Sequence, residues 1–409
     1  MSERRTATTR TGVNAATQTG DDTPKASPNA TPKASPNATP KASPSATPVP
    51  TSTLTSIPTQ PPGPPPPTTS ETPAPAPPAP PKPNVVIHEV WASNLDEEFI
   101  NIRKLVGHYP YVAFDTEFPG VVATPVGVFR NKDEFQYTQM SHNVNLLKVI
   151  QIGICLVNKD GELPPKGDIW QFNFKFTTEK DMYSIESVNL LRRSGIDFEK
   201  NRTLGIRLEE FGALLTTSGL VANEEVTWLT FHSCFDYGYL IKSIIIKNLP
   251  PESKDFIYLH KILFPRSFDI KVLMKAPNIQ SAQLHGGLQD IADQLSVERF
   301  GAQHQAGSDS LLTAKTFFKL RSVFFHDSWD KVAEVVEGLM FGLTKANQVS
   351  FEGLPLTAPI NFRKPLAYLP KPRPERIRDP PRPSKLLSVV NPKTMQETMV
   401  FPLPPPINT

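Results

Sequence analysis

The clearest pattern in the chain is an apolar stretch that ends in two acids, residues 111–118 (YVAFDTEF). Its first half is apolar, as expected of a buried strand, and strand side chains alternate between two faces. Asp115 and Glu117 should therefore point to one side, with Thr116 on the other. Neighbouring carboxylates repel each other unless a cation lies between them, and their oxygens suit hard ions such as Mg²⁺ or Mn²⁺. A metal site is one explanation of the pattern, and chance acids at a solvated strand end are the simpler one.

Three more stretches have the pattern of strands. Residues 149–157 are almost continuously apolar, which predicts a strand buried on both faces. In residues 168–176 aromatic and polar side chains alternate, which predicts a half-buried strand. Residues 227–231 form a short fourth candidate.

Apolar residues at helical spacing predict helices between and after these strands. The first should begin after Asn94, with Glu97 placed to complete a capping box, and end before Gly107. Further helices are expected before Gly195 and Gly219, and over residues 133–147, 235–247, 253–263, 287–295, 308–325 and 329–340. Strands surrounded by helices indicate an α/β core of two or three layers.

The two ends of the chain differ from this core. Residues 1–83 contain the octapeptide TPKASPNA three times in a row, the last copy with one substitution, and then polyproline. Without apolar periodicity nothing offsets the entropy of ordering, so we predict a disordered Pro/Thr/Ser/Ala-rich arm. Residues 343–409 are predicted to form a basic, Pro-rich disordered tail. The predicted folded domain is residues 84–342.

Charge and composition narrow the class of protein. The formal net charge of +3 divides into +3 for residues 1–83, +6 for residues 343–409 and −6 for the domain between them. An acidic domain fits a site made of carboxylates, and the basic ends fit either contacts with RNA or simple solubility. Only two cysteines are present, which excludes a disulfide scaffold and fits a reducing compartment. We expect no membrane span and no secretory signal, because no long apolar run occurs.

Two further acids stand where helices should begin. Asp236 follows a predicted strand in FHSCFD, and Asp309 ends the segment HQAGSD, which starts with His304. A carboxylate in the first turn of a helix faces the positive end of the helix dipole and stays ionised. Singly, each acid is explained as a helix cap and His304 as a structural residue. The ordered set of D-x-E, an acid at a helix start and H-x-x-x-x-D instead points to one shared site.

In these motifs the sequence resembles the DEDD exonucleases, in the subtype with histidine in the third motif, and among them the Caf/Pop deadenylases. The segments that carry the resemblance are EVW from Glu89, DTEFPGVVA from Asp115, WQFNF from Trp170, FHS from Phe231, GGLQ from Gly286 and HQAGSDSLLT from His304. The resemblance covers about residues 88–342. It departs at Cys234, where the family usually has glycine.

The resemblance implies an RNase H-like α/β fold, with a mixed central sheet flanked by helices. It implies that Asp115, Glu117, Asp236 and Asp309 hold two divalent cations, Mg²⁺ or Mn²⁺, with Asp115 bridging them. His304 would be the general base that takes a proton from the attacking water. The candidate substrate contacts are Phe118, His232 and Leu288.

The implied activity is metal-dependent 3′→5′ hydrolysis of poly(A) tails with release of 5′-AMP, as a subunit of the CCR-NOT complex in mRNA decay and translational repression. The implied partners are single-stranded poly(A) RNA, the Not scaffold protein, the companion exonuclease of the complex and regulators of the Tob/BTG type. The implied compartments are the cytoplasm, including mRNA-decay granules, and the nucleus.

Two other functions use the same fold. The domain could serve mainly as a binding platform for the same partners, but a platform does not need all five site residues. It could also be a DNA-proofreading exonuclease of the same superfamily. The segments typical of deadenylases argue against that second alternative, whereas the catalytic residues alone do not.

Overall fold

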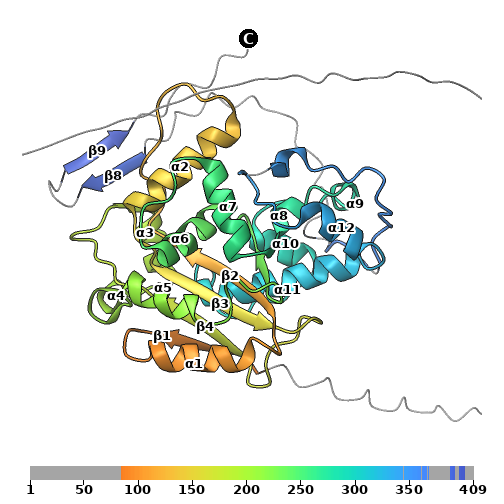
Figure 1. Ribbon diagram of the computed structural model, residues 1–409, viewed down its shortest axis with the longest axis horizontal. Helices are drawn as coiled ribbons and strands as arrows, with labels where there is room; N and C mark the ends of the chain where they lie inside the picture. The colour runs from red at the N-terminus through yellow and green to blue at the C-terminus, as the bar shows by residue number, and fades with distance from the viewer. Residues whose placement is uncertain are drawn as a thin grey trace, which may run out of the picture. The chain divides into compact units, whose positions relative to one another are not determined.

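The computed structural model describes residues 84–343, 345–360, 362–365, 367, 387–391 and 396–400 (Figure 1). These residues belong to one compact unit of the chain, Pro78–Thr409. The predicted arm of residues 1–83 lies outside the described residues, and so does most of the chain after residue 367. The predictions of disorder for both ends therefore stay predictions.

A mixed sheet of six strands forms the centre of the described domain (Figure 1). The strands are β1 (Val86–Val90), β2 (Tyr111–Glu117), β3 (Gln151–Val157), β4 (Asp168–Asn173), β6 (Thr227–Thr230) and β7 (Arg266–Asp269). Their order across the sheet is β1-β4-β3-β2-β6-β7. β3 runs antiparallel to β2 and β4, whereas the other neighbours are parallel. The predicted fold class, an RNase H-like mixed sheet, is confirmed.

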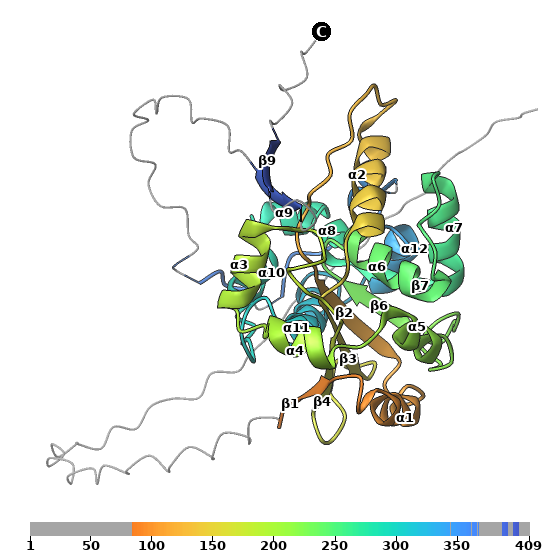
Figure 2. The same ribbon diagram turned by 90° about the vertical axis from the view of Figure 1, so that its left-hand side faces the viewer.

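Helices cover both faces of this sheet (Figure 2). One layer shares an apolar core and consists of α1 (Leu95–Leu105), α2 (Lys132–Leu146), α5 (Leu208–Thr216), α6 (Cys234–Ile245) and α7 (Ser253–Leu263). The other layer has its own core and consists of α8 (Ile270–Leu273), α9 (Pro277–Ser281), α10 (Leu288–Gln294), α11 (Ala306–Phe324) and α12 (Trp329–Val336). The shorter helices α3 (Ile185–Arg193) and α4 (Phe198–Leu204) adjoin a small third apolar cluster.

Two local predictions were wrong. The strand predicted to be half-buried, β4, is buried along nearly its whole length, including the polar side chains of Gln171 and Asn173, which are 3% and 2% exposed. The capping box at Asn94 does not form, because its Oδ1 accepts the Trp91 N–H at 2.8 Å instead of bonding within α1. The helices expected from apolar spacing are present with shifts of a few residues at their ends, but β1, β7, α4, α8 and α9 were not predicted.

The described chain continues to pack beyond residue 342. Leu343, Ala346 and Phe351 are 4%, 0% and 7% exposed, and a short 3₁₀ helix covers Lys345–Gln348. Further along, β8 (Leu387–Asn391) pairs antiparallel with the two-residue strand β5 (Tyr183–Ser184) and with β9 (Gln396–Val400). The predicted domain limits stay a prediction, and these contacts show which residues after 342 touch the core.

Among the described helices, none is both long and apolar enough to cross a membrane. Both cysteines, Cys155 and Cys234, are buried free thiols.

Candidate active site

Three elements bring the four predicted acids together. Asp115 and Glu117 stand at the end of β2, Asp236 lies in the first turn of α6, and Asp309 lies in the first turn of α11. α11 packs directly against β2 and β3. Asp115 is close enough to the other three carboxylates for each of them to raise its pKa. Residues almost 200 positions apart in sequence therefore share one electrostatic site.

This concentration of buried negative charge perturbs the acids strongly. Burial, reinforced by the neighbouring carboxylates, raises the pKa of Asp115 and of Glu117 well above the usual range. Burial also raises the pKa of Asp236 to about 6. Hydrogen bonds from Thr116 to Asp236 Oδ1, at 3.0 Å from the backbone N–H and 2.5 Å from Oγ1, partly oppose that rise. In the absence of cations, the site favours bound protons.

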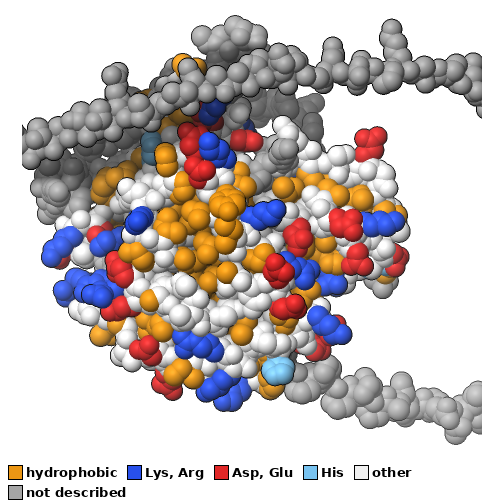
Figure 3. Space-filling model, viewed as in Figure 1, with side chains coloured by type: hydrophobic (Ala, Val, Ile, Leu, Met, Phe, Trp, Pro, Cys, Tyr) orange, Lys and Arg blue, Asp and Glu red, His pale blue; other side chains and the backbone are white. Residues whose placement is uncertain are grey.

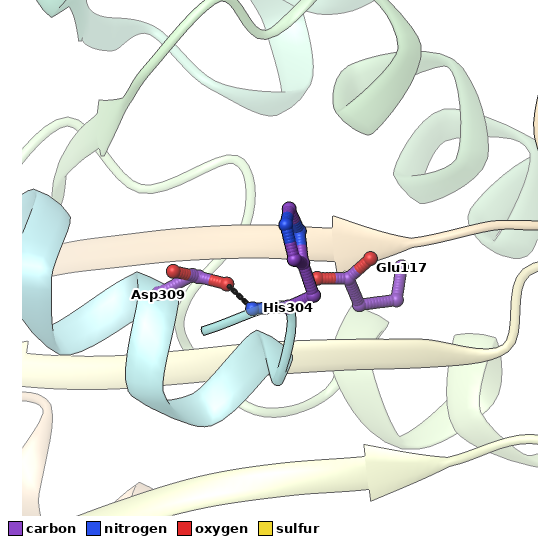
Figure 4. Close-up of side chains that lie close together, drawn as sticks. All are labelled: Glu117, His304 and Asp309. Atoms are coloured by element: carbon purple, nitrogen blue, oxygen red, sulfur yellow. Dashed lines mark hydrogen bonds between the residues drawn. The ribbon is translucent and has the colours of Figure 1, made fainter. Parts of the chain in front are cut away.

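His304 lies beside two of these acids (Figure 4). One ligand atom each from Glu117, His304 and Asp309 lies within 4.8 Å of the others. The backbone N–H of His304 donates to Asp309 Oδ2 at 2.9 Å, so the chain folds back over the start of α11. His304 has a φ of 60°, a conformation that is costly for any residue but glycine and that persists only where the surroundings impose it.

The start of α11 is held against the sheet by side chains of β3 and β4. A Cβ at Gly153 would lie 1.9 Å from the Ala306 carbonyl oxygen, so only glycine allows this approach. Gln171 Oε1 accepts the Gly307 N–H at 2.9 Å, and Gln151 Oε1 accepts the Ala306 N–H at 3.3 Å. These bonds satisfy donors that the first turn of a helix leaves without partners. They also fix the helix that carries Asp309.

Sequence analysis missed one residue of the site, Arg299. Its Nη2 lies 2.6 Å from Asp309 Oδ1, and the two side chains are only 13% and 9% exposed. The same guanidinium donates to Ser308 Oγ at 2.8 Å and to Gln289. Its charge opposes the rise in the pKa values of Asp115 and Glu117. No motif pointed to Arg299, because its role depends on the fold and not on its spacing from Asp309.

The three predicted substrate contacts lie in separate elements. Phe118, just after β2, stacks on Phe235 with ring centroids 5.2 Å apart and lies 5.3 Å from Tyr239, so its ring is partly covered by the core. Leu288 is the first residue of α10 and is half-buried. His232 is exposed and precedes Asp236 by four residues.

Cys234 replaces the glycine that the resemblance leads one to expect. It opens α6, is 8% exposed and belongs to the apolar core on that side of the sheet. Burial above all raises the pKa of its thiol, so the substitution adds no negative charge beside Asp236.

Several known proteins are similar to this chain in sequence. Residues 90–210 match the family model described as CAF1 family ribonuclease. The chain is 58% identical over 261 residues to CCR4-NOT transcription complex subunit 7 of Caenorhabditis elegans, an alignment that covers 64% of this chain and 84% of that protein. The chain belongs to the CAF1 family of ribonucleases. It is also 44% identical over 294 residues to poly(A) ribonuclease pop2 of Schizosaccharomyces pombe, covering 72% of this chain and 86% of that protein.

Solved structures of the CAF1 family have the same fold. The chain is similar to S. pombe Pop2p in its Mg²⁺- and Mn²⁺-bound form, with a TM-score of 0.60 and 47% identity over 63% of this chain and 99% of that one. It is similar to the structure of yeast NOT1 MIF4G domain co-crystallized with CAF1, with a TM-score of 0.52 and 32% identity over 64% of this chain and 99% of that one.

Proposed function

We propose that this CAF1-family chain is a metal-dependent 3′→5′ exoribonuclease that shortens poly(A) tails and releases 5′-AMP. The observation that carries the proposal is the meeting of Asp115, Glu117, Asp236 and Asp309 beside His304. The similarity to a poly(A) ribonuclease supports the choice of substrate.

The donor set fits two divalent cations such as Mg²⁺ or Mn²⁺. It consists of carboxylate oxygens. Burial raises the pKa values of Asp115, Glu117 and Asp236, repulsion from neighbouring site carboxylates adds to the rise for Asp115 and Glu117, and bound cations would relieve both effects. Asp115, Glu117, Asp236 and Asp309 would hold the cations, whose chemistry is to polarise the phosphodiester and to lower the pKa of a bound water. The likeness to Pop2p with Mg²⁺ and Mn²⁺ bound supports the assignment.

The remaining residues would orient groups and move a proton. A ring nitrogen of His304 would accept the proton of the attacking water, as a general base does. Thr116 keeps Asp236 in place through two hydrogen bonds to one oxygen. Arg299 and the His304 N–H each bind one oxygen of Asp309, which restricts the rotation of that carboxylate.

The proposal extends to partners and location. We infer that the chain binds the Not scaffold protein, since one similar structure contains CAF1 with NOT1 MIF4G and a relative is named as a CCR4-NOT subunit. The companion exonuclease and Tob/BTG-type regulators are further proposed partners. The proposed compartments are the cytoplasm, including mRNA-decay granules, and the nucleus. These latter proposals rest on the sequence resemblance.

The test is degradation of an A-tailed RNA labelled at its 5′ end. With Mg²⁺ we expect a ladder that shortens one nucleotide at a time, and with EDTA no degradation. Asp115→Asn should abolish the activity, whereas Asp160→Asn, which removes an exposed acid outside the site, should not. Cutting of a circular A-rich RNA would show endonuclease action and would contradict the proposal.

A second variant distinguishes three roles open to His304: general base, metal ligand and structural residue. If His304 is the base, His304→Ala should lower kcat by ~10²–10⁴ while calorimetry finds Mn²⁺ binding unchanged. Weakened Mn²⁺ binding would instead make His304 a ligand, and an unchanged kcat would make it structural.

A further inference from the structure

The loop between β6 and α6 holds an exposed histidine in a strained conformation. His232 has a φ of 65°, in the left-handed region that favours glycine. The backbone N–H of His232 donates to Asp269 Oδ1 at 2.8 Å. The backbone N–H groups of Ser233 and Phe341 donate to Asp269 Oδ2 at 3.2 and 3.0 Å. Asp269 is 2% exposed, so a buried carboxylate fixes the backbone while the imidazole stays at the surface. Strain of this kind gathers at binding sites.

Two aromatic rings and two lysines lie near this histidine. We call the five residues Phe231, His232, Lys271, Lys275 and Phe341 the aromatic–lysine strip. The His232 ring meets the Phe341 ring edge-on at 4.9 Å. Lys275 Nζ lies 5.1 Å from the centroid of the Phe341 ring, and Lys271 Nζ lies 5.1 Å from that of Phe231. Cation–π contacts of this length hold ammonium groups in place at a surface.

The strip is connected to the candidate active site by two routes. His232 precedes Asp236 by four residues, which a chain can extend over at most ~14 Å. On the other side, Lys271 Nζ donates to the Gly286 carbonyl at 2.6 Å, at the start of the segment that leads into α10. Gln289 in that helix binds Arg299, which in turn binds Asp309.

The chemistry of the strip fits single-stranded RNA. Lysines bind phosphates and an exposed ring stacks on or hydrogen-bonds to a base, a combination common to proteins that hold single strands. Lys271 spends one of its three N–H donors on the Gly286 carbonyl and keeps donors for a phosphate. On the face drawn in Figure 3, basic and acidic side chains are interspersed, so that face offers no broad basic field for RNA. Local contacts such as these matter more in a domain with a net charge of −6.

Resting on the proposed function, we propose that the aromatic–lysine strip is a subsite for the RNA immediately upstream of the nucleotide being removed. Lys271 binds one of its phosphates, Lys275, whose Nζ also donates to the Ala346 carbonyl at 2.6 Å, adds a second positive charge, and the His232 ring contacts a base. Phe231 and Phe341 set the positions of the two ammonium groups. The strip thus gives the enzyme affinity for a longer single strand without contributing to the bond-breaking step.

The experiment compares how the full-length protein degrades a long and a short RNA substrate in the presence of Mg²⁺. Loss of one charged hydrogen bond weakens binding by about tenfold, so Lys271→Ala should raise KM for a long oligo(A) by about that factor. A dinucleotide has no phosphate upstream of the bond that is cut, so its kcat/KM should change far less in Lys271→Ala. The slope of log KM against log salt should fall by ~0.7 for each phosphate that the variant no longer binds. His232→Ala should raise KM for the long substrate as well, without the change in salt slope.

Lys247→Ala is the matched control, because Lys247 is an exposed lysine just beyond the opposite end of α6. Lys271→Arg should keep the wild-type salt slope. Equal losses for long and short substrates, or the same result for Lys271→Ala and Lys247→Ala, would overturn the subsite. A wild-type chain inactive on all RNA would instead refute the proposed function, so the two failures are distinguishable.

Discussion

Thr116 and Asp236 show how single residues of the site balance opposing effects. Burial disfavours the ionised carboxylate of Asp236, whereas two hydrogen bonds from Thr116 favour it, and burial is the larger effect. Thr116 was expected to point away from the acids of β2. It does so, and thereby reaches the acid of α6. One oxygen of Asp236 is thus already bound by protein donors.

The raised pKa of Asp236 predicts how the metal-free protein responds to pH. Its folded-state pKa of about 6 lies above the ordinary value of 3.8, so folding takes up a proton between these values. The stabilisation is complete below about pH 4 and is lost as pH rises through about 6, a difference of ~3 kcal/mol. Asp115 and Glu117 act in the same direction. We therefore expect Tm in EDTA to fall as pH rises from about 4 to above 6.

Calorimetry with and without Mg²⁺ checks this prediction. Mg²⁺ should restore Tm at neutral pH, and Asp236→Asn should weaken the pH dependence in EDTA. A Tm in EDTA that rises steadily over the same range would show that the acids are not electrostatically crowded.

At the scale of elements, local sequence patterns predicted most helices but did not predict the contacts between distant segments. The apolar spacing of residues 253–263 gave α7 with the bounds it has. By contrast, the alternation in residues 168–176 suggested exposed polar side chains. The Gln171 side chain instead accepts the backbone N–H of Gly307 at the start of α11, 136 residues further along the chain. The site acids were suggested by motif order, whereas Arg299 and Gln151 had no sequence signal. Side chains that act through another element gain their role only when the sheet and helix meet.

The contact between β3 and α11 gives a prediction at this scale. Gly153→Ala would place a Cβ 1.9 Å from the Ala306 carbonyl oxygen, and backbone on both sides leaves little room to adjust. Overpacking of this kind costs ~1–3 kcal/mol, and the displaced helix start carries Asp309. We expect Gly153→Ala to lower Tm and, because Asp309 is displaced, to lower kcat as well.

Gly107→Ala is the control for that variant, since a Cβ at Gly107 meets nothing within 4 Å and its φ is not positive. Steady-state kinetics and thermal melting of both variants show whether Gly153→Ala alone lowers kcat and Tm. If Gly153→Ala keeps full kcat, the close approach of β3 and α11 does not position Asp309.

At the scale of the whole molecule, the candidate site and the C-terminal segment that packs on the core lie in different parts of the chain. The domain of residues 84–342 carries −6 and the two ends carry the compensating positive charge. All five candidate site residues lie within that domain. After residue 342, Leu343 joins the core on the α6 side of the sheet, whereas Phe351 packs with residues of α8 and α11 in the core on the other side. Residues up to 342 should therefore suffice for activity, whereas full stability should also require residues after 342.

That separation predicts the result of shortening the chain. Ala346 and Phe351 are buried, the Ile360 N–H donates to the Val323 carbonyl at 3.0 Å, and Lys275 Nζ donates to the Ala346 carbonyl at 2.6 Å. Fully burying one large apolar side chain contributes ~1.5–3 kcal/mol, so a chain of residues 84–342 should melt below one of residues 84–365. Both shortened chains should degrade an A–A dinucleotide with similar kcat, because every candidate site residue is retained. The longer chain should match the full-length protein in Tm. Equal melting temperatures for the two shortened chains would mean that residues 343–365 add no stability, and loss of activity in both would place part of the site in the ends that were removed.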